Sequence, residues 1–285
     1  MDEIKENSFS EDDNSNKKQR IFFDRKLCKK VAREQLKSRM VIPVISTVIF
    51  IGVLFVLQKS PLIPQDYKEL MNRIMAKEQV TIMFTELIGI IRKMSLYFAI
   101  SFILSSTFKG AYIQFYQKMF RTKENLFFSD FVDGFSICIK AVFIQFYVYI
   151  PVLTGFLVFF LASIQSKPGI SLLGFFMMLF GCIRYYARKM AMYVIAEYPK
   201  MGVFKACGLS RIMTGGYKFD LFLFDLSFFP WALFSELSFY AGYLWYLPYK
   251  NMSMVNAYYL LKKNALDLGL VKDSDFQTEF LQLTV

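Results

Sequence analysis

The sequence predicts an all-α protein, a polytopic membrane helix bundle of about six transmembrane helices with cytoplasmic amphipathic helices. Two observations lead to this prediction. First, 55% of the 285 residues are hydrophobic, and they gather in segments long enough to cross a bilayer. Second, most Lys and Arg residues lie between these segments, on one side of the predicted membrane.

The net charge of +11 is explained better by a membrane than by nucleic acid. The basic residues stand beside apolar segments, where topology and anionic lipid headgroups account for them. We therefore expect no nucleic-acid partner. The expected partners are the lipid bilayer, with anionic phospholipid at the cytoplasmic face, and another membrane protein.

The chain lacks the residues that most catalytic sites need. It has no His, which removes the commonest general base and the His-ligated metals. The motifs of zinc proteases, serine hydrolases, P-loop nucleotide-binding proteins and dinucleotide-binding enzymes are also missing. The four cysteines form no CxxC pair. We expect no enzymatic activity, no catalytic residue, no cofactor and no metal.

The first 40 residues divide into two parts. Residues 1–20 are polar and charged and are predicted to be disordered. Residues 21–40 form a basic amphipathic helix, either lying on the anionic cytoplasmic leaflet or leading as a solvated helix into the first span. Its predicted apolar positions are Phe23, Leu27, Val31 and Leu36.

The first predicted span covers 41–58, an uninterrupted apolar run. Pro43 is tolerated there because it falls in the first helical turn. The polar segment before this run lacks the features of a cleavable signal peptide, so we expect the span to be retained.

The second span depends on how two adjacent cations, Arg92 and Lys93, are placed. One span over 80–108 would put both near the bilayer centre. Alternatively, 68–93 is an outer amphipathic helix and the span covers about 94–115. We favour the second arrangement, because each central cation costs about 3 kcal/mol.

Four more spans follow an inner loop at 116–140. The third, at 141–163, and the fourth, which starts near Ile170, are joined by a short QSKPG turn, and the fourth helix is expected to continue past the membrane to about Ala196. After an amphipathic inner piece, a last hairpin forms spans five and six, and a cytoplasmic tail ends the chain. The membrane domain is thus 41–260, with hairpin spans at 218–238 and 239–260 and a tail at 261–285.

The distribution of basic residues sets the orientation. With the N-terminus inside, inner segments hold 24 of the 34 Lys and Arg residues and outer segments hold seven. This excess satisfies the positive-inside rule. We therefore predict a multi-pass protein of the cell membrane with both termini in the cytoplasm.

A few charges fall within the predicted spans, mostly in the cytoplasmic half of the bilayer, and Asp225 is expected to pair with Lys250 or Arg184. Such a cluster can line a polar cavity for an anionic lipid headgroup, a peptide or an ion. It can equally lock the helices together, or place Lys and Arg at the inner headgroups. The candidate residues are Lys109, Arg184, Asp220, Asp225 and Lys250.

Several motifs of this chain are similar to those of a bacterial integral membrane family, domain of unknown function 975. Glu197 and Tyr198 stand where that family usually has Asp and Asn, and Glu197 itself is interpreted as a helix cap or surface group. The similar stretches are VAREQLKS (31–38), SDFVDGF (129–135), MAMYVIAEYP (190–199), LSRIMTGGYKFDLFLFDLSFFPW (209–231) and LWYLPY (244–249).

This resemblance implies a six-span bacterial membrane protein and carries no activity with it. The family also resembles, distantly, the non-catalytic membrane domain attached to some glycerophosphodiester phosphodiesterases. The expected function is therefore a scaffold or a lipid- or protein-interacting subunit. The alternative is a transporter or channel for a small solute, peptide or lipid, which a polar cavity at the intramembrane charges would favour.

Overall fold

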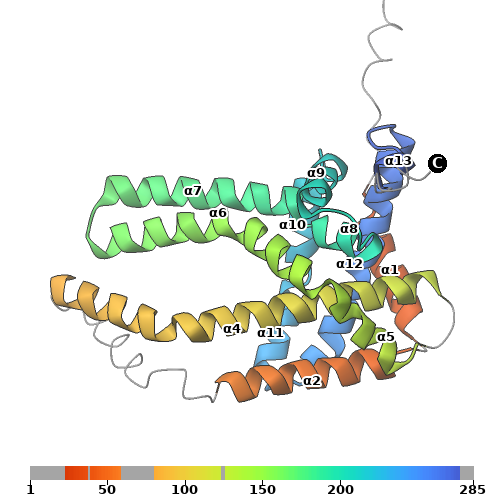
Figure 1. Cartoon of the computed structure of the whole chain (residues 1–285), viewed down its shortest axis with the longest axis horizontal. Helices are drawn as coiled ribbons and strands as arrows, with labels where there is room; N and C mark the ends of the chain where they lie inside the picture. The colour runs from red at the N-terminus through yellow and green to blue at the C-terminus, as the bar shows by residue number, and fades with distance from the viewer. Residues whose placement is uncertain (1–22, 38, 59–79, 123–125, 277–285) are drawn as a thin grey trace, which may run out of the picture.

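The described part of the chain is helical. The computed structural model describes residues 23–37, 39–58, 80–122 and 126–276, and it contains no strand within these ranges. The all-α class is therefore confirmed for them (Figure 1). The predicted disordered segment 1–20 lies outside the described residues, as does 68–79 of the predicted outer helix.

The helices match predicted spans one, three and four closely and differ from the prediction over 80–121 and in the last hairpin. Their bounds are α1 Arg25–Leu36, α2 Val41–Gln58, α4 Val80–Arg121, α5 Phe128–Asp133, the 3₁₀ helix η1 Gly134–Ile137, α6 Cys138–Ile164, α7 Pro168–Arg188, α8 Ala191–Glu197, α9 Val203–Met213, α10 Lys218–Leu226, α11 Phe229–Leu237, α12 Tyr243–Asp267 and α13 Asp273–Phe276.

Three helical stretches among the described residues are long and apolar enough to cross a membrane. They are Ser95–Arg121, Phe128–Ile164 and Pro168–Glu197, which correspond to predicted spans two, three and four. A fourth candidate span is added if α1 and α2, which are bent by 99° relative to each other, are counted as one broken span. Large apolar side chains on α6 and α7 are exposed, as lipid-facing residues are, among them Phe143 and Phe176.

Helix α4 runs without interruption from Val80 past Arg92 to Arg121. The prediction of a separate outer helix ending at residue 93 was therefore wrong, because this stretch has no proline to end a helix and its one early glycine, Gly89, is tolerated. The apolar window nevertheless starts at Ser95, immediately after the two cations. This start agrees with placing the charges outside the span.

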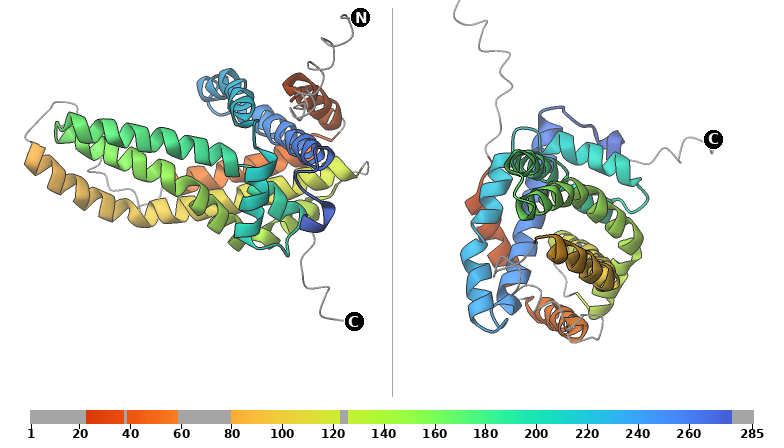
Figure 2. Two further views of the ribbon diagram at one scale, coloured as in Figure 1. Left: turned by 90° about the horizontal axis from the view of Figure 1, so that it is seen from above. Right: turned by 90° about the vertical axis from the view of Figure 1, so that its left-hand side faces the viewer.

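The hairpin of α6 and α7 is packed through glycines. A Cβ atom on Gly155 would lie 2.3 Å from the backbone nitrogen of Met178, and one on Gly174 would lie 2.3 Å from that of Phe159. Small residues allow two membrane helices to approach this closely and to gain van der Waals contact. The α6–α7 hairpin is therefore a tightly joined unit, and α4 runs beside it (Figures 1 and 2).

The last hairpin differs from the prediction. The expected span 218–238 is divided into α10 and α11, because Pro230 starts a new helix and lacks the N–H that would continue the old one. Helix α12 starts at Tyr243 and continues to Asp267, beyond the predicted end of span six. Figures 1 and 2 show α11 and α12 crossing the direction of α4, α6 and α7.

Helix α1 packs against α12 through part of the predicted face. Phe23 and Leu36 are buried as predicted, whereas Leu27, a predicted apolar contact, is 49% exposed. Between them the buried positions are Cys28 and Ala32, each one residue after the predicted Leu27 and Val31. The Lys29 ammonium donates to Ser227 Oγ at 2.6 Å, at the break between α10 and α11.

Burial protects the thiol of Cys207 in α9. Desolvation raises the pKa of this thiol to about 11, and the thiolate is the form that alkylates. We expect native protein to react slowly with iodoacetamide at Cys207 near neutral pH, and unfolded protein to react fully. Mass spectrometry of labelled peptides checks this, with Cys207→Ser as the control. Rapid native labelling at Cys207 contradicts the packing of α9.

Candidate functional site

An ion pair joins the end of α7 to the end of α10. The ammonium of Lys189 contacts the carboxylate of Asp225, and their side chains are only 10% and 18% exposed. The prediction that Asp225 pairs with Lys250 or Arg184 was therefore wrong. Helix α7 ends at Arg188 and packs on α10, which brings the next residue, Lys189, to the carboxylate.

Two of the predicted residues lie beside this pair. Lys109 of α4 interacts electrostatically with Lys189, Lys250 and Asp225, and Lys189 also interacts with Lys250. The Lys109 ammonium donates to the amide oxygen of Gln145 at 3.1 Å. We call Lys109, Lys189 and Lys250, with Asp225, the lysine cluster.

Arg184 and Asp220 take no part in the ion pairs and hydrogen bonds found among the described residues of the lysine cluster. The Nε of Arg184 is buried without a hydrogen-bond partner, and its guanidinium lies 5.8 Å from the centroid of the Phe180 ring. Asp220 lies in the first turn of α10, where a carboxylate stabilises the helix dipole. The structure thus brings together three of the five predicted residues.

The charges of the lysine cluster do not balance. Three ammonium groups face one carboxylate, which leaves an excess of two positive charges if all are ionised. Aromatic groups offset part of this excess: Lys189 lies 5.4 Å from the centroid of the Tyr186 ring, and Lys250 donates to the hydroxyl of Tyr246 at 3.1 Å. Such an arrangement is suited to binding an anion.

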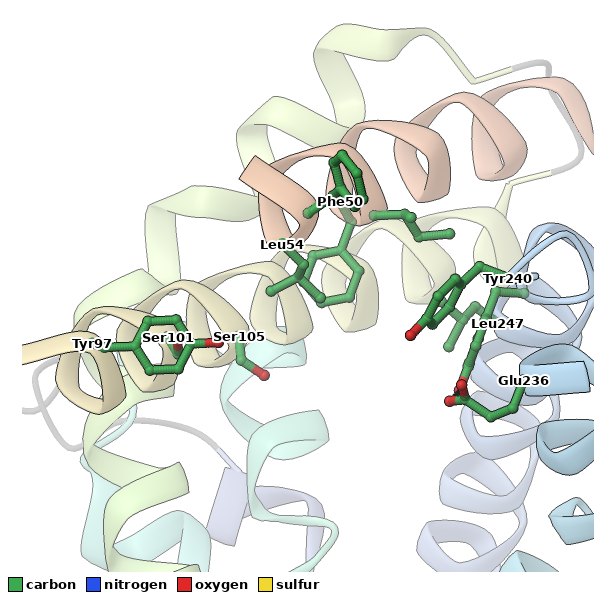
Figure 3. Close-up of a pocket in the computed structure, with 11 residues that line it drawn as sticks. Phe50, Leu54, Tyr97, Ser101, Ser105, Glu236, Tyr240 and Leu247 are labelled. Atoms are coloured by element: carbon green, nitrogen blue, oxygen red, sulfur yellow. Dashed lines mark hydrogen bonds between the residues drawn. The ribbon is translucent and has the colours of Figure 1, made fainter. Parts of the chain in front are cut away.

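A cleft lies between α2, α4 and the α11–α12 hairpin (Figure 3), and its lining residues do not include the four residues of the lysine cluster. Its volume is about 460 Å³. Ser105 and Leu247 line it, and they lie one helical turn before Lys109 and Lys250 on the same helix faces. The other lining residues are mainly apolar or aromatic: Phe50, Ile51, Leu54, Phe55, Tyr97, Ser101, Glu236, Tyr240 and Tyr243.

A second polar contact joins α8 to α12. Glu197 accepts a hydrogen bond from Tyr258 at 2.5 Å and pairs with Lys262 at 2.8 Å. Its side chain is largely buried, so its interpretation as a cap or surface group was wrong. Helix α12 extends to Asp267, which carries Lys262 alongside α8. This contact is fully paired and leaves no charge for a ligand.

Metal-ligating side chains do not gather among the described residues. Within them, no group of three or more His, Cys, Asp and Glu side chains is placed to hold a metal ion. The lysine cluster supplies hydrogen-bond donors and positive charge instead. Lys189 was not predicted as a member because it lies beyond the apolar part of span four, among the inner basic residues. A prediction that α7 ends at Arg188 would have identified Lys189 as a member.

Comparison with known protein families gives a match over most of the chain. A family model described as "Protein of unknown function (DUF975)" matches residues 23–265. No curated protein and no solved structure matches the chain. The distant likeness to the membrane domain of glycerophosphodiester phosphodiesterases stays a prediction.

Proposed function

The chain belongs to the family described as protein of unknown function (DUF975), and from its own residues we propose a non-enzymatic protein of the cell membrane that binds anionic phospholipid. In this proposal it acts as a scaffold or as a lipid- or protein-interacting subunit. Both termini lie in the cytoplasm, and the chain crosses the membrane six times.

The exposed surface of the last hairpin supports the six-span topology. Phe219, Phe229, Leu233 and Leu237 on α10 and α11 are large apolar side chains exposed to the surroundings. Such a surface is costly in water and favourable in lipid. The six spans are then α2, α4, α6, α7, the broken helix α10–α11, and α12, the last two inclined to the others.

The observation that carries the lipid proposal is the exposed basic surface of α1 and the residue that follows it. Lys26, Lys30 and Lys37 are exposed, and the apolar Leu27 stands exposed among them. The opposite face of α1 is fixed on the protein by Cys28, Ala32 and Leu36. The helix therefore presents cations and one apolar anchor to an anionic leaflet.

Neutralising these lysines tests the proposal. Each lysine near an anionic surface contributes about 1 kcal/mol, so Lys26→Gln, Lys30→Gln and Lys37→Gln together should weaken phosphatidylglycerol binding at least tenfold. The measurement is the rise in Tm of the detergent-purified chain as phosphatidylglycerol is added.

The matched control is Lys167→Gln, at the exposed tip between α6 and α7 on the outer side. It should bind phosphatidylglycerol as the unaltered chain does. Equal lipid-dependent stabilisation of the triple variant and the unaltered chain would reject α1 as the lipid-binding surface.

Transport of an anionic solute is the second candidate function, and the positive excess of the lysine cluster favours it. The mainly apolar lining of the neighbouring cleft argues for an amphipathic ligand over a small water-soluble one. Lipid binding is therefore the preferred function.

A further inference from the structure

We propose that the lysine cluster binds the phosphate of one anionic phospholipid, and that the acyl chains of this lipid lie in the cleft of Figure 3. The inference deepens the proposed function and rests on its topology. It assigns a single buried site, separate from the exposed lysines of α1.

The charge of the cluster points to an anion. Asp225 is already paired with Lys189, while the hydrogen bonds of Lys109 and Lys250 go to an uncharged amide and an uncharged phenol. Partly buried cations of this kind are stabilised by an opposite charge at hydrogen-bond distance. One phosphodiester supplies a negative charge and two free oxygens that can accept from ammonium groups.

The cleft fits the rest of a phospholipid. Its volume of about 460 Å³ lies within the range of ligand pockets, and Phe50, Leu54 and Leu247 give it apolar walls. The Oγ of Ser101, on the α4 wall, is buried without a hydrogen-bond partner. A serine hydroxyl in an apolar wall can donate to the ester carbonyl of a lipid.

The direction of the cleft matches a lipid of the cytoplasmic leaflet. Along α4, Tyr97 and Ser101 line it toward the proposed outer side, while Ser105 lines it one helical turn before Lys109. The lysines would attract the phosphate at the Ser105 end. The headgroup would therefore lie toward the cytoplasm and the chains toward the bilayer centre.

Native mass spectrometry of the full chain in mild detergent tests the inference. After delipidation, one equivalent of phosphatidylglycerol should rebind and survive a detergent wash, whereas phosphatidylcholine should be lost. The double variant Lys109→Met and Lys250→Met should bind phosphatidylglycerol at least tenfold more weakly. Met keeps the length of the side chain and removes the charge, so the variant should fold with an unchanged or higher Tm.

Three further samples distinguish the buried site from the alternatives. Ser101→Trp should fill the cleft and displace the lipid while the lysines remain, and the α1 triple variant should retain the single washed lipid. Inorganic phosphate in excess should not compete, because it has no acyl chain.

Three results would overturn the inference. They are full retention of the lipid by the double methionine variant, full retention by Ser101→Trp, and competition by inorganic phosphate. If only the α1 variant loses lipid, the surface proposal survives and the buried site is rejected.

Discussion

Asp225→Asn is expected to destabilise the chain by about 3 kcal/mol or more, because it leaves a buried ammonium without its carboxylate. Lys189 loses its ion-pair partner, and Lys109 and Lys250 remain nearby. The three cations then repel one another with no opposite charge among them. The measurement is Tm in detergent without added anionic lipid, together with the loss of monodisperse protein on heating.

One control changes a different carboxylate of α10, and the other changes both members of the Lys189–Asp225 ion pair. Asp220→Asn removes a carboxylate from the first turn of α10 and should cost less than about 1 kcal/mol, through the helix dipole. Adding Lys189→Met to Asp225→Asn removes the stranded charge and should recover much of the lost stability. An Asp225→Asn protein as stable as Asp220→Asn would contradict the buried pair.

Gly174→Leu should open the α6–α7 hairpin. The Cβ of any larger residue at this position would lie 2.3 Å from the Phe159 backbone nitrogen and 2.6 Å from its Cα, and backbone atoms cannot rotate away. Overpacking of a well-packed interface costs about 1–3 kcal/mol, and a leucine at a backbone contact should reach the upper end. We expect a lower Tm and a larger aggregated fraction after extraction.

Gly52→Leu is the matched control, since it makes the same change in the apolar helix α2. A Cβ at Gly52 meets no atom within 4 Å, so leucine there should be neutral or slightly stabilising through its better helix propensity. If Gly174→Leu and Gly52→Leu lower the Tm equally, the hairpin does not depend on this close approach.

The positions of most helices can be predicted from hydropathy, but the residues at which the helices end cannot. The apolar run after Val41 and the short turn before Pro168 were both predicted from the sequence. The continuity of α4 was not, because two adjacent charges mark a membrane boundary without interrupting a helix that holds no proline. The break before Pro230 does not follow from the proline alone, because Pro151 and Pro248 stand inside the continuous helices α6 and α12.

The candidate site was partly predictable for a similar reason. Lys109, Asp225 and Lys250 stand out because ionisable residues are rare within apolar spans. Lys189 does not, since it follows the apolar run and resembles any inner basic residue. The pairing of Lys189 with Asp225 depends on where α7 ends and how α10 packs on it, and such tertiary contacts leave no periodic pattern in the sequence.

An electron cryo-microscopy map of the full chain in nanodiscs of phosphatidylglycerol shows whether the lysine cluster binds the phosphate of a lipid. We expect phosphate density within about 3 Å of the ammonium groups of Lys109 and Lys250, continuing as acyl-chain density toward Leu247 and Phe50. Density for ordered lipid around α1, with the cluster and cleft closed by protein side chains, would contradict it.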